Sequence, residues 1–195
     1  MTRPERRLPT RLIGSALWRG VDEISLDRFR LEEFSGGLII SGRVLAAREQ
    51  KSIEVHYTVL CNPAWETIEA HVTLISGENP QQLHVRRDSR DQWWREESPI
   101  AEVAGATDID ISITPATNTL PIRRLALQVG ESRDVDAAWV RIPELTLSRL
   151  SQRYTRTGER SYRYESGNGS FKADLEVDAE GIVLSYGSLW ENVAS

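Results

Sequence analysis

The stretch that decides the fold class is Ile53–Leu74, which reads IEVHYTVLCNPAWETIEAHVTL. Apolar and polar residues alternate from Ile53 to Val59, and they alternate again from Ile68 to Leu74. A period of two residues is the pattern of a β-strand with one buried face and one solvated face. Asn62-Pro63 lies between the two runs, and both residue types favour turns. The stretch therefore predicts an antiparallel hairpin.

The register of this hairpin follows from the residues that must share the buried face. Apolar residues occupy odd positions in the first run and even positions in the second, so paired residue numbers must add to an odd sum. A tight turn at Pro63-Ala64 places His56 opposite His71, and a slip of two residues places His56 opposite Glu69. In either register both histidines share one polar face with Glu54 and Glu69.

Further alternating runs predict strands along most of the chain. They lie at Ser25–Phe34, Leu38–Leu45, Leu83–Val85, Ile109–Ile113, Leu125–Val129, Val135–Ile142, Leu145–Tyr154, Ser161–Glu165, Ser170–Val177 and Gly181–Tyr186. The first of these could also be a short helix capped by Ser25, but the β pattern around it favours a strand. Many short strands separated by turn residues predict an all-β fold, either an antiparallel barrel, roll or sandwich, without a strong helix.

The domain organisation is predicted to be simple. The chain has 195 residues, which suits one domain of ordinary to large size. Residues 1–12 are basic and read as a flexible arm, and residues 13–195 as one β domain. The least regular region, Arg86–Gly105, is too short to link two domains of normal size.

Composition excludes several classes of protein. Lys and Arg number 24 against 29 Asp and Glu, and this net charge of −5 argues against a nucleic-acid-binding protein. No apolar run approaches the roughly 20 residues of a membrane helix, and no secretory signal is recognisable. The single cysteine, Cys61, excludes an internal disulfide and reads as structural rather than nucleophilic. We expect a cytoplasmic protein.

The segment Asp108–Leu127 is the strongest candidate for a functional site. Ile109, Ile111 and Ile113 face one way in the predicted strand, and Asp108 and Asp110 face the other. A polar loop bounded by Pro115 and Pro121 follows, and the pair Arg123-Arg124 then lies at the mouth of the next predicted strand. Two acids, a polar loop and two arginines so close together indicate a site.

Two interpretations of the aspartates stay open. Asp108 and Asp110 lie roughly 7 Å apart along the strand and could act as general acid and base on a sugar. The alternative is that they form ion pairs, with Arg123 or Arg124 as partner. We favour the ion pairs, because a catalytic pair needs two environments that separate its pKa values.

A metal site is the less favoured interpretation of the hairpin's polar face. Glu54, His56, Glu69 and His71 offer suitable ligand atoms. Cross-strand pairs on a solvated sheet face have the same composition, and no dense ligand motif is present. We therefore predict no metal and no cofactor.

Six tryptophans are many for a chain of this length. Trp93 and Trp94 are adjacent, so an extended backbone points them to opposite sides, and at least one should leave the core. An exposed indole can stack on a sugar. This pair is therefore the better surface candidate among the six.

Several motifs together resemble those of the bacterial putative glycolipid-binding family. They are Cys61–Trp65 (CNPAW), Thr117–Leu125 (TNTLPIRRL), Gln152–Thr155 (QRYT), Tyr162–Ser166 (YRYES) and Val177–Val183 (VDAEGIV). The resemblance runs from about Trp18 to Trp190, and TNTLPIRRL is its most specific part. It implies a spiral β-roll related in shape to periplasmic lipoprotein carriers. Ala116 replaces the family's usual aromatic residue, Ala106 stands near its usual cysteine, and Tyr186–Leu189 departs from its usual ending, Tyr-Pro-Gly-Leu.

The leading hypothesis is a non-catalytic protein that binds an amphipathic molecule, such as a glycolipid, on the concave face of the roll. The predicted rim residues are Asp108, Asp110, Asn118, Arg123, Arg124, Trp93 and Trp94. Their alternative role is an internal polar network that joins parts of the roll. Two other functions stay open: an enzyme that uses Asp108 and Asp110 on a carbohydrate or small polar metabolite, and an interaction module that dimerises through an exposed sheet edge.

Overall fold

The computed structural model describes residues 9–48 and 50–195. Of the predicted arm, residues 1–8 lie outside this range, and the first strand begins at Arg11. The strands are β1 (Arg11–Gly20), β2 (Ser25–Phe34), β3 (Gly37–Arg48), β4 (Lys51–Cys61), β5 (Thr67–Ile75), β6 (Gln81–Arg87), β7 (Trp93–Arg95), β8 (Ser98–Pro99), β9 (Asp108–Ile111), β10 (Ser132–Arg141), β11 (Thr146–Arg156), β12 (Ser161–Ser166), β13 (Phe171–Val177), β14 (Val183–Tyr186) and β15 (Trp190–Ala194).

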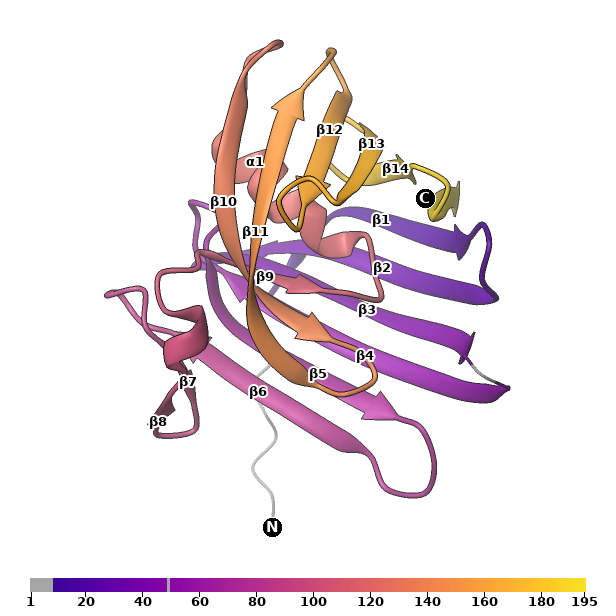
Figure 1. Ribbon diagram of the computed structural model, residues 1–195, viewed down its shortest axis with the longest axis vertical. Coiled ribbons are helices and arrows are strands. Elements are labelled where there is room, and N and C mark those ends of the chain that lie inside the picture. The colour runs from indigo at the N-terminus through magenta and orange to yellow at the C-terminus, as the bar shows by residue number, and fades with distance from the viewer. Residues whose placement is uncertain (1–8, 49) are drawn as a thin grey trace.

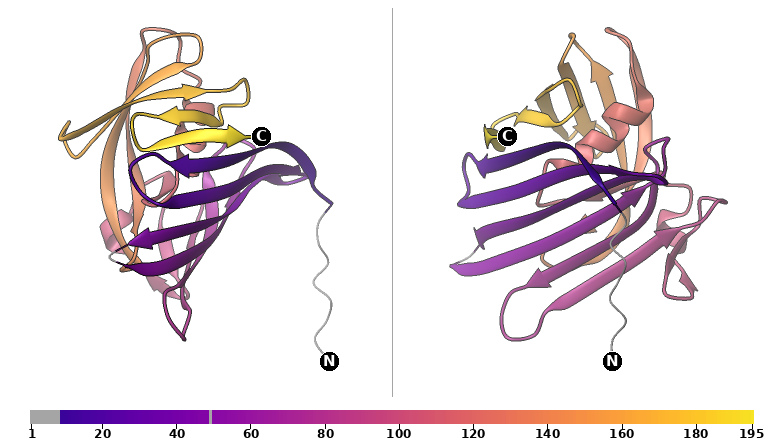
Figure 2. Two further views of the ribbon diagram at one scale, coloured as in Figure 1. Left: turned by 90° about the vertical axis from the view of Figure 1, so that its right-hand side faces the viewer. Right: turned by 180° about the vertical axis from the view of Figure 1, so that it is seen from behind.

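In the described residues these strands form one sheet of fifteen, in the order β8-β7-β6-β5-β4-β3-β2-β1-β15-β14-β13-β12-β11-β10-β9. Neighbouring strands are antiparallel except β9 and β10, which are parallel. The sheet curls on itself, so that β9–β11 cross over the face of β2–β5 (Figures 1 and 2). The prediction of one all-β domain is confirmed, including the strand at Ser25–Phe34.

The curled sheet meets itself near Thr67, at the start of β5. The backbone N–H of Ile109 in β9 donates to Thr67 Oγ1 at 3.1 Å, and the N–H of Thr67 donates to the carbonyl oxygen of Thr107 at 3.3 Å. These bonds join the last strand of the sheet to a strand in its other half. The roll is thereby pinned at its seam.

Among the described residues the single α-helix, α1 (Thr119–Leu125), begins inside the predicted polar loop and ends at Leu125, where a strand was predicted to start. Residues 126–130 form no strand. The helix follows the 3₁₀ turn η2 (Ala116–Asn118), while another short 3₁₀ turn, η1 (Ala101–Val103), precedes β9. Pro121 is tolerated because the first helical turn leaves its backbone donors unpaired in any case. Leu120 and Ile122 are buried, so tertiary packing stabilises a helix too short to persist alone. The prediction of a strand entered by Arg123 and Arg124 is therefore wrong.

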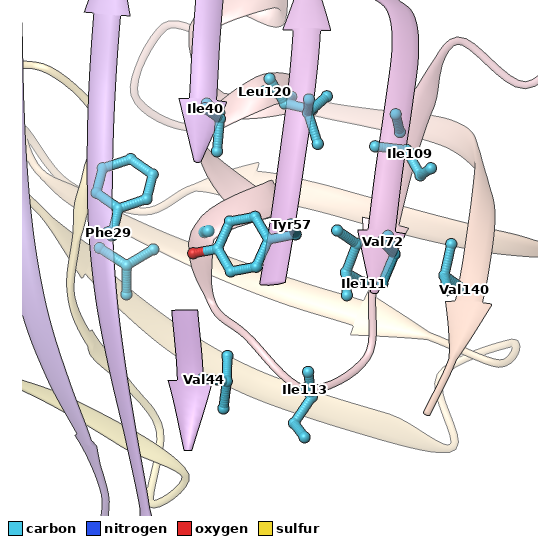
Figure 3. Close-up of a cluster of buried hydrophobic side chains, with 14 of the residues drawn as sticks. Phe29, Ile40, Val44, Tyr57, Val72, Ile109, Ile111, Ile113, Leu120 and Val140 are labelled. Atoms are coloured by element: carbon cyan, nitrogen blue, oxygen red, sulfur yellow. The ribbon is translucent and has the colours of Figure 1, made fainter. Parts of the chain in front are cut away.

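The concave face of the roll is filled by side chains of the chain itself. Phe29, Ile40 and Tyr57 of β2–β4 point towards Ile111 of β9 and Leu120 of α1 (Figure 3). Each of these five side chains is at most 2% exposed. The centre of the roll is therefore a packed core, and an apolar ligand cannot be housed there without displacing it.

The hairpin predicted at Ile53–Leu74 has the predicted faces but a different register. His56 pairs with Thr73, and His71 pairs with Thr58, so the odd sum is confirmed and both predicted pairings are wrong. The register shifts between Leu60 and Cys61, where a bulge interrupts the ladder. The side-chain oxygen of Asn62 accepts hydrogen bonds from the N–H groups of Ala64 and Glu66, which holds a loop longer than the predicted tight turn.

No helix in residues 9–48 and 50–195 is long and apolar enough to span a membrane.

Candidate functional site

Asp108 lies at the start of β9 and forms a buried ion pair. Its carboxylate is 1% exposed and accepts from Arg124 through Nη2 to Oδ2 at 2.5 Å and Nε to Oδ1 at 3.2 Å. Burial raises the pKa of Asp108, and the guanidinium of Arg124 opposes that rise. The ion-pair interpretation is confirmed for Asp108, with Arg124 as its partner.

Asp110 has uncharged hydrogen-bond partners instead. Its carboxylate accepts from Thr117 Oγ1 at 3.0 Å and from Gln152 Nε2 at 2.6 Å. The same Gln152 amide donates to the hydroxyl of Tyr164 at 3.0 Å. Loss of solvation raises the pKa of Asp110 to about 6, these two hydrogen bonds oppose the rise, and the nearby charge of Asp108 adds to it. The two aspartates therefore differ in environment, but each is engaged by internal partners.

Asn118 joins the same interior region from η2. Its side-chain oxygen accepts from the hydroxyl of Tyr154 at 2.8 Å, and its amide donates to the carbonyl of Pro115 at 3.1 Å. Both Asn118 and Tyr154 are buried. This contact ties the loop before α1 to β11.

A third buried carboxylate, Asp27 of β2, was not singled out from the sequence. It accepts from the hydroxyl of Tyr57 at 3.0 Å and from Thr114 Oγ1, and burial raises its pKa to about 6. Gly42 makes the contact possible, because a Cβ there would lie 2.2 Å from the Tyr57 hydroxyl oxygen. The alternation in β2 could have identified Asp27, because residues two apart in a strand face the same way and Asp27 therefore shares the buried face with Phe29.

These residues form what we call the inner network, namely Asp27, Tyr57, Asp108, Asp110, Thr114, Thr117, Asn118, Arg124, Gln152, Tyr154 and Tyr164. It consists of four separate hydrogen-bonded groups, around Asp27, Asp108, Asp110 and Asn118. The last three groups each tie β9, η2 or α1 to another element of the roll. Buried polar groups of this kind fix the arrangement of a core when each has a partner. The geometry supports the alternative role as an internal network for Asp108, Asp110, Asn118 and Arg124.

The other three predicted site residues lie elsewhere. Arg123 is half-buried in the last turn of α1, with its guanidinium 5.1 Å from the ring centroid of Trp65 and donating to the carbonyl of Ala179 at 3.4 Å. Trp93 is fully buried and donates to the carbonyl of Ala106 at 2.8 Å, whereas Trp94 is half-buried and donates to Asp88 at 2.9 Å. The prediction that one of the two indoles leaves the core is confirmed. A ligand-binding role for any of the seven residues stays a prediction.

The predicted polar face of four residues separates into two groups. In the first group His56 contacts Glu54. In the second, His71 contacts Glu69 at 2.7 Å, and His84, which was not among the predicted residues, contacts the same carboxylate. Cys61 is buried, and burial raises the pKa of its thiol, which fits a structural cysteine.

A largely apolar hollow lies at one end of the roll, where the β1–β2 loop meets the end of β3, the start of β4 and the end of β5. We call it the end groove. It has a volume of about 980 Å³, and its apolar lining is Val21, Ile24, Leu26, Leu45, Ile53 and Ile75. Arg19, Asp22, Glu23 and Glu54 also line it. A ligand pocket in a protein of this size typically has about 300–1,000 Å³.

The lining of the end groove is exposed although its backbone is fixed. Ile24 is 82% exposed, and Val21, Leu26 and Leu45 are 44–50% exposed. The N–H of Val21 donates to the carbonyl of Leu189 at 2.9 Å, and the N–H of Ala47 donates to the carbonyl of Ile24 at 2.9 Å. The β1–β2 loop, which carries Val21 and Ile24, is therefore held at both ends, and Leu26 and Leu45 lie in the strands beside it. An apolar surface that is both open and held in place is typical of an interaction site.

Comparison with known proteins identifies the family. The model of the family described as "Putative glycolipid-binding" matches residues 15–192. The chain belongs to this family. A solved structure of a DUF1089 family protein from Pseudomonas aeruginosa is 30% identical, with a TM-score of 0.79, over 95% of this chain and 98% of that one. No curated protein matches.

Proposed function

We propose that this family member binds an amphipathic lipid-like molecule, of the glycolipid class, with the apolar part of the ligand in the end groove. The observation that carries the proposal is the cluster of exposed apolar side chains on the β1–β2 loop and the adjoining strands, with Ile24 at 82% exposure. Covering such side chains with an acyl chain contributes roughly 25 cal/mol for each Å² of apolar surface removed from water.

The ligand's polar part has partners beside the apolar lining. Arg19, Asp22, Glu23 and Glu54 lie around the groove, and carboxylates and guanidinium groups can accept from and donate to sugar hydroxyls. This location differs from the one expected from the sequence, because the concave face is packed with Phe29, Tyr57 and Leu120. Binding without catalysis fits the end groove, whose lining does not include the buried aspartates of the inner network.

The test is a titration with octyl glucoside below its micelle concentration, followed by amide NMR shifts. Glucose and octanol in separate titrations measure the contributions of the sugar and the chain. We expect octyl glucoside to shift the amides of residues 20–26, 45–47 and 75–77 most, and glucose alone to shift them little. Shifts confined to strands around α1 would contradict the location, and no saturable shift with this or longer-chain glycosides would contradict the function.

A matched pair of variants sharpens this experiment. Leu45→Glu places a charge in the groove, whereas Leu12→Glu places the same charge on a side chain of similar exposure, 47% against 50%, at the far end of the β1–β3 ribbon. We expect the first variant to weaken binding by more than about tenfold, since about 1.4 kcal/mol of apolar contact corresponds to that factor. The second variant should bind like the wild type.

A further inference from the structure

Three side chains with metal-ligand chemistry meet on the outer face of β5 and β6. Glu69 and His71 are two residues apart on β5 and therefore point to the same side of the sheet. His84 of β6 pairs directly with His71. Between them, Ala70 and Val85 point into the core, which fixes both strands and the direction of the three polar side chains.

The three groups converge on a single carboxylate oxygen. Glu69 Oε1 lies 2.7 Å from His71 Nε2 and 2.6 Å from His84 Nε2, and one ligand atom from each residue lies within 4.8 Å of the others. The two imidazole rings are stacked, with centroids 3.9 Å apart and planes at 14°. Strand pairing thus holds two imidazoles and one carboxylate next to one another on the same face of the sheet.

We propose that Glu69, His71 and His84 bind one divalent transition-metal ion of borderline softness, such as Zn²⁺, with water in its remaining coordination positions. Imidazole nitrogen and carboxylate oxygen are ligands that Zn²⁺ accepts at about 2.0–2.2 Å. Neutral imidazoles suit Zn²⁺, Cu²⁺ and Ni²⁺, whereas Mg²⁺ and Ca²⁺ prefer oxygen ligands. The site is distinct in chemistry from the end groove and does not depend on the proposed lipid-like ligand.

The side chains, but not the strands, must rearrange to admit the ion, because rings stacked 3.9 Å apart with planes at 14° direct their in-plane lone pairs side by side. Ligand atoms of a tetrahedral site lie about 3.4 Å apart if each bond is near 2.1 Å, so each hydrogen bond to Glu69 must open by less than about 1 Å. The side chains of His71, His84 and Glu69 are 55%, 48% and 33% exposed, which leaves them room to rotate. Each neutral imidazole then carries its single proton on Nδ1 and offers Nε2 to the ion, so the two hydrogen bonds to Glu69 are exchanged for bonds to the metal.

The charges around the site also permit a cation. Partial burial raises the pKa of Glu69, but hydrogen bonds from His71 and His84 outweigh it, so the pKa is lowered and the carboxylate is ionised at neutral pH. Arg86 is the strand partner of Glu69, yet its guanidinium lies over the ring of Trp94 at 5.7 Å and reaches the carbonyl of Glu96 at 3.5 Å. Its charge is thus engaged on the side of Trp94.

The remaining histidine of the chain, His56, provides a control. His56 contacts Glu54 on the outer face of β4, but Glu54 also contacts Arg43 at 3.2 Å. A single imidazole beside a carboxylate already paired with arginine is a weak site. Replacing His56 therefore removes a histidine without touching the proposed ligands.

The experiment is calorimetric titration of the full-length protein, free of any affinity tag, with ZnCl₂ and, separately, MgCl₂ near pH 7.5. We expect one saturable Zn²⁺ site and no comparable Mg²⁺ binding. His84→Asn and Glu69→Gln should each weaken Zn²⁺ binding by more than about tenfold, since losing even an outer partner of a ligand costs about 10–100-fold. His56→Asn should change it by less than about twofold.

NMR of the histidine ring protons gives a second readout. Zn²⁺ should shift the ring signals of His71 and His84 in the wild type and leave those of His56 in place, and circular dichroism verifies that each variant is folded. If His84→Asn fails to fold, His71→Gln serves in its place. Absence of a saturable Zn²⁺ site, equal loss on replacing His56, or unshifted signals of His71 and His84 would overturn the proposal.

Discussion

The inner network and the end groove use opposite kinds of residue. The inner network consists of buried and half-buried polar side chains, each held by internal partners, such as Asp108 with Arg124. The end groove has apolar side chains left open to solvent on the β1–β2 loop and the adjoining strands, such as Ile24 and Leu45. In this protein the polar motif that looks like a site stabilises the fold. The surface suited to a ligand contains no recognisable motif.

The largest expected effect lies in the inner network. Arg124→Met keeps an unbranched side chain but leaves the Asp108 charge buried without its partner, so we expect the free energy of unfolding to fall by about 3–5 kcal/mol. Urea denaturation measures this change. Adding Asp108→Asn to the variant should restore part of the loss, because it removes the stranded charge. A fall in unfolding free energy below about 1 kcal/mol would show that the inner network is not needed for stability, and it would then not differ from the end groove in this respect.

The packing of α1 is tested next. Leu120 is fully buried between the helix and the concave face, so Leu120→Ala should lower the free energy of unfolding by about 2–5 kcal/mol. The measurement is again urea denaturation, with Leu184→Ala as control because that side chain is 38% exposed. Equal effects of the two substitutions would mean that the concave face is not a packed core.

The buried carboxylates predict an unusual pH dependence. Burial raises the pKa of Asp27 from 3.8 to about 6, so between these values the folded protein holds more of the proton than the unfolded chain does. The contribution of Asp27 to stability therefore falls as the pH rises through this window. Relative to the wild type, Asp27→Asn should gain about 1–3 kcal/mol in unfolding free energy between about pH 4 and pH 7.

Chemical denaturation at several pH values measures this difference. Asp134→Asn is the control, because Asp134 is exposed and its hydrogen bonds from Arg153 lower its pKa. Parallel stability curves for the wild type and Asp27→Asn would show that burial does not perturb Asp27.

The smallest expected effect on stability lies in the end groove. Ile24→Glu alters a side chain that is 82% exposed, so the free energy of unfolding should change by no more than about 0.5 kcal/mol. The same variant should lose binding of octyl glucoside. Thermal melting and the NMR titration together separate the two readouts. A large loss of stability would show that the groove lining stabilises the fold, as the inner network does.

The part of the fold that could be predicted from the sequence is the part that depends on alternation of apolar and polar residues. A period of two residues identified the strands and their buried faces, as for Ile53–Val59. Alternation did not give the register of the hairpin. The bulge between Leu60 and Cys61 and the loop held by Asn62 depend on the backbone, and neither changes the pattern of apolar residues. Alternation also missed α1, because Leu120 and Ile122 are helical only through packing against the roll.

The candidate sites were predicted less completely than the fold. The pairing of Asp108 with an arginine followed from their closeness in sequence, and the structure confirms it for Arg124. The convergence of His84 with His71 depends on the β5–β6 pairing, for which no register had been derived. The end groove gathers residues from several turns, and no local pattern in the sequence brings Ile24 and Leu45 together.

The two borders of the described sheet have a consequence for self-association. One border is β8, which has two residues and ends in Pro99, a residue without a backbone donor. The other is β9, which has four residues and is bonded to Thr67 of the same molecule. A strand of a neighbouring molecule that paired with either border would form few backbone hydrogen bonds. Concentrated solutions should therefore resist fibre growth, and a dimer, if one forms, should be joined through side chains rather than through a shared ladder.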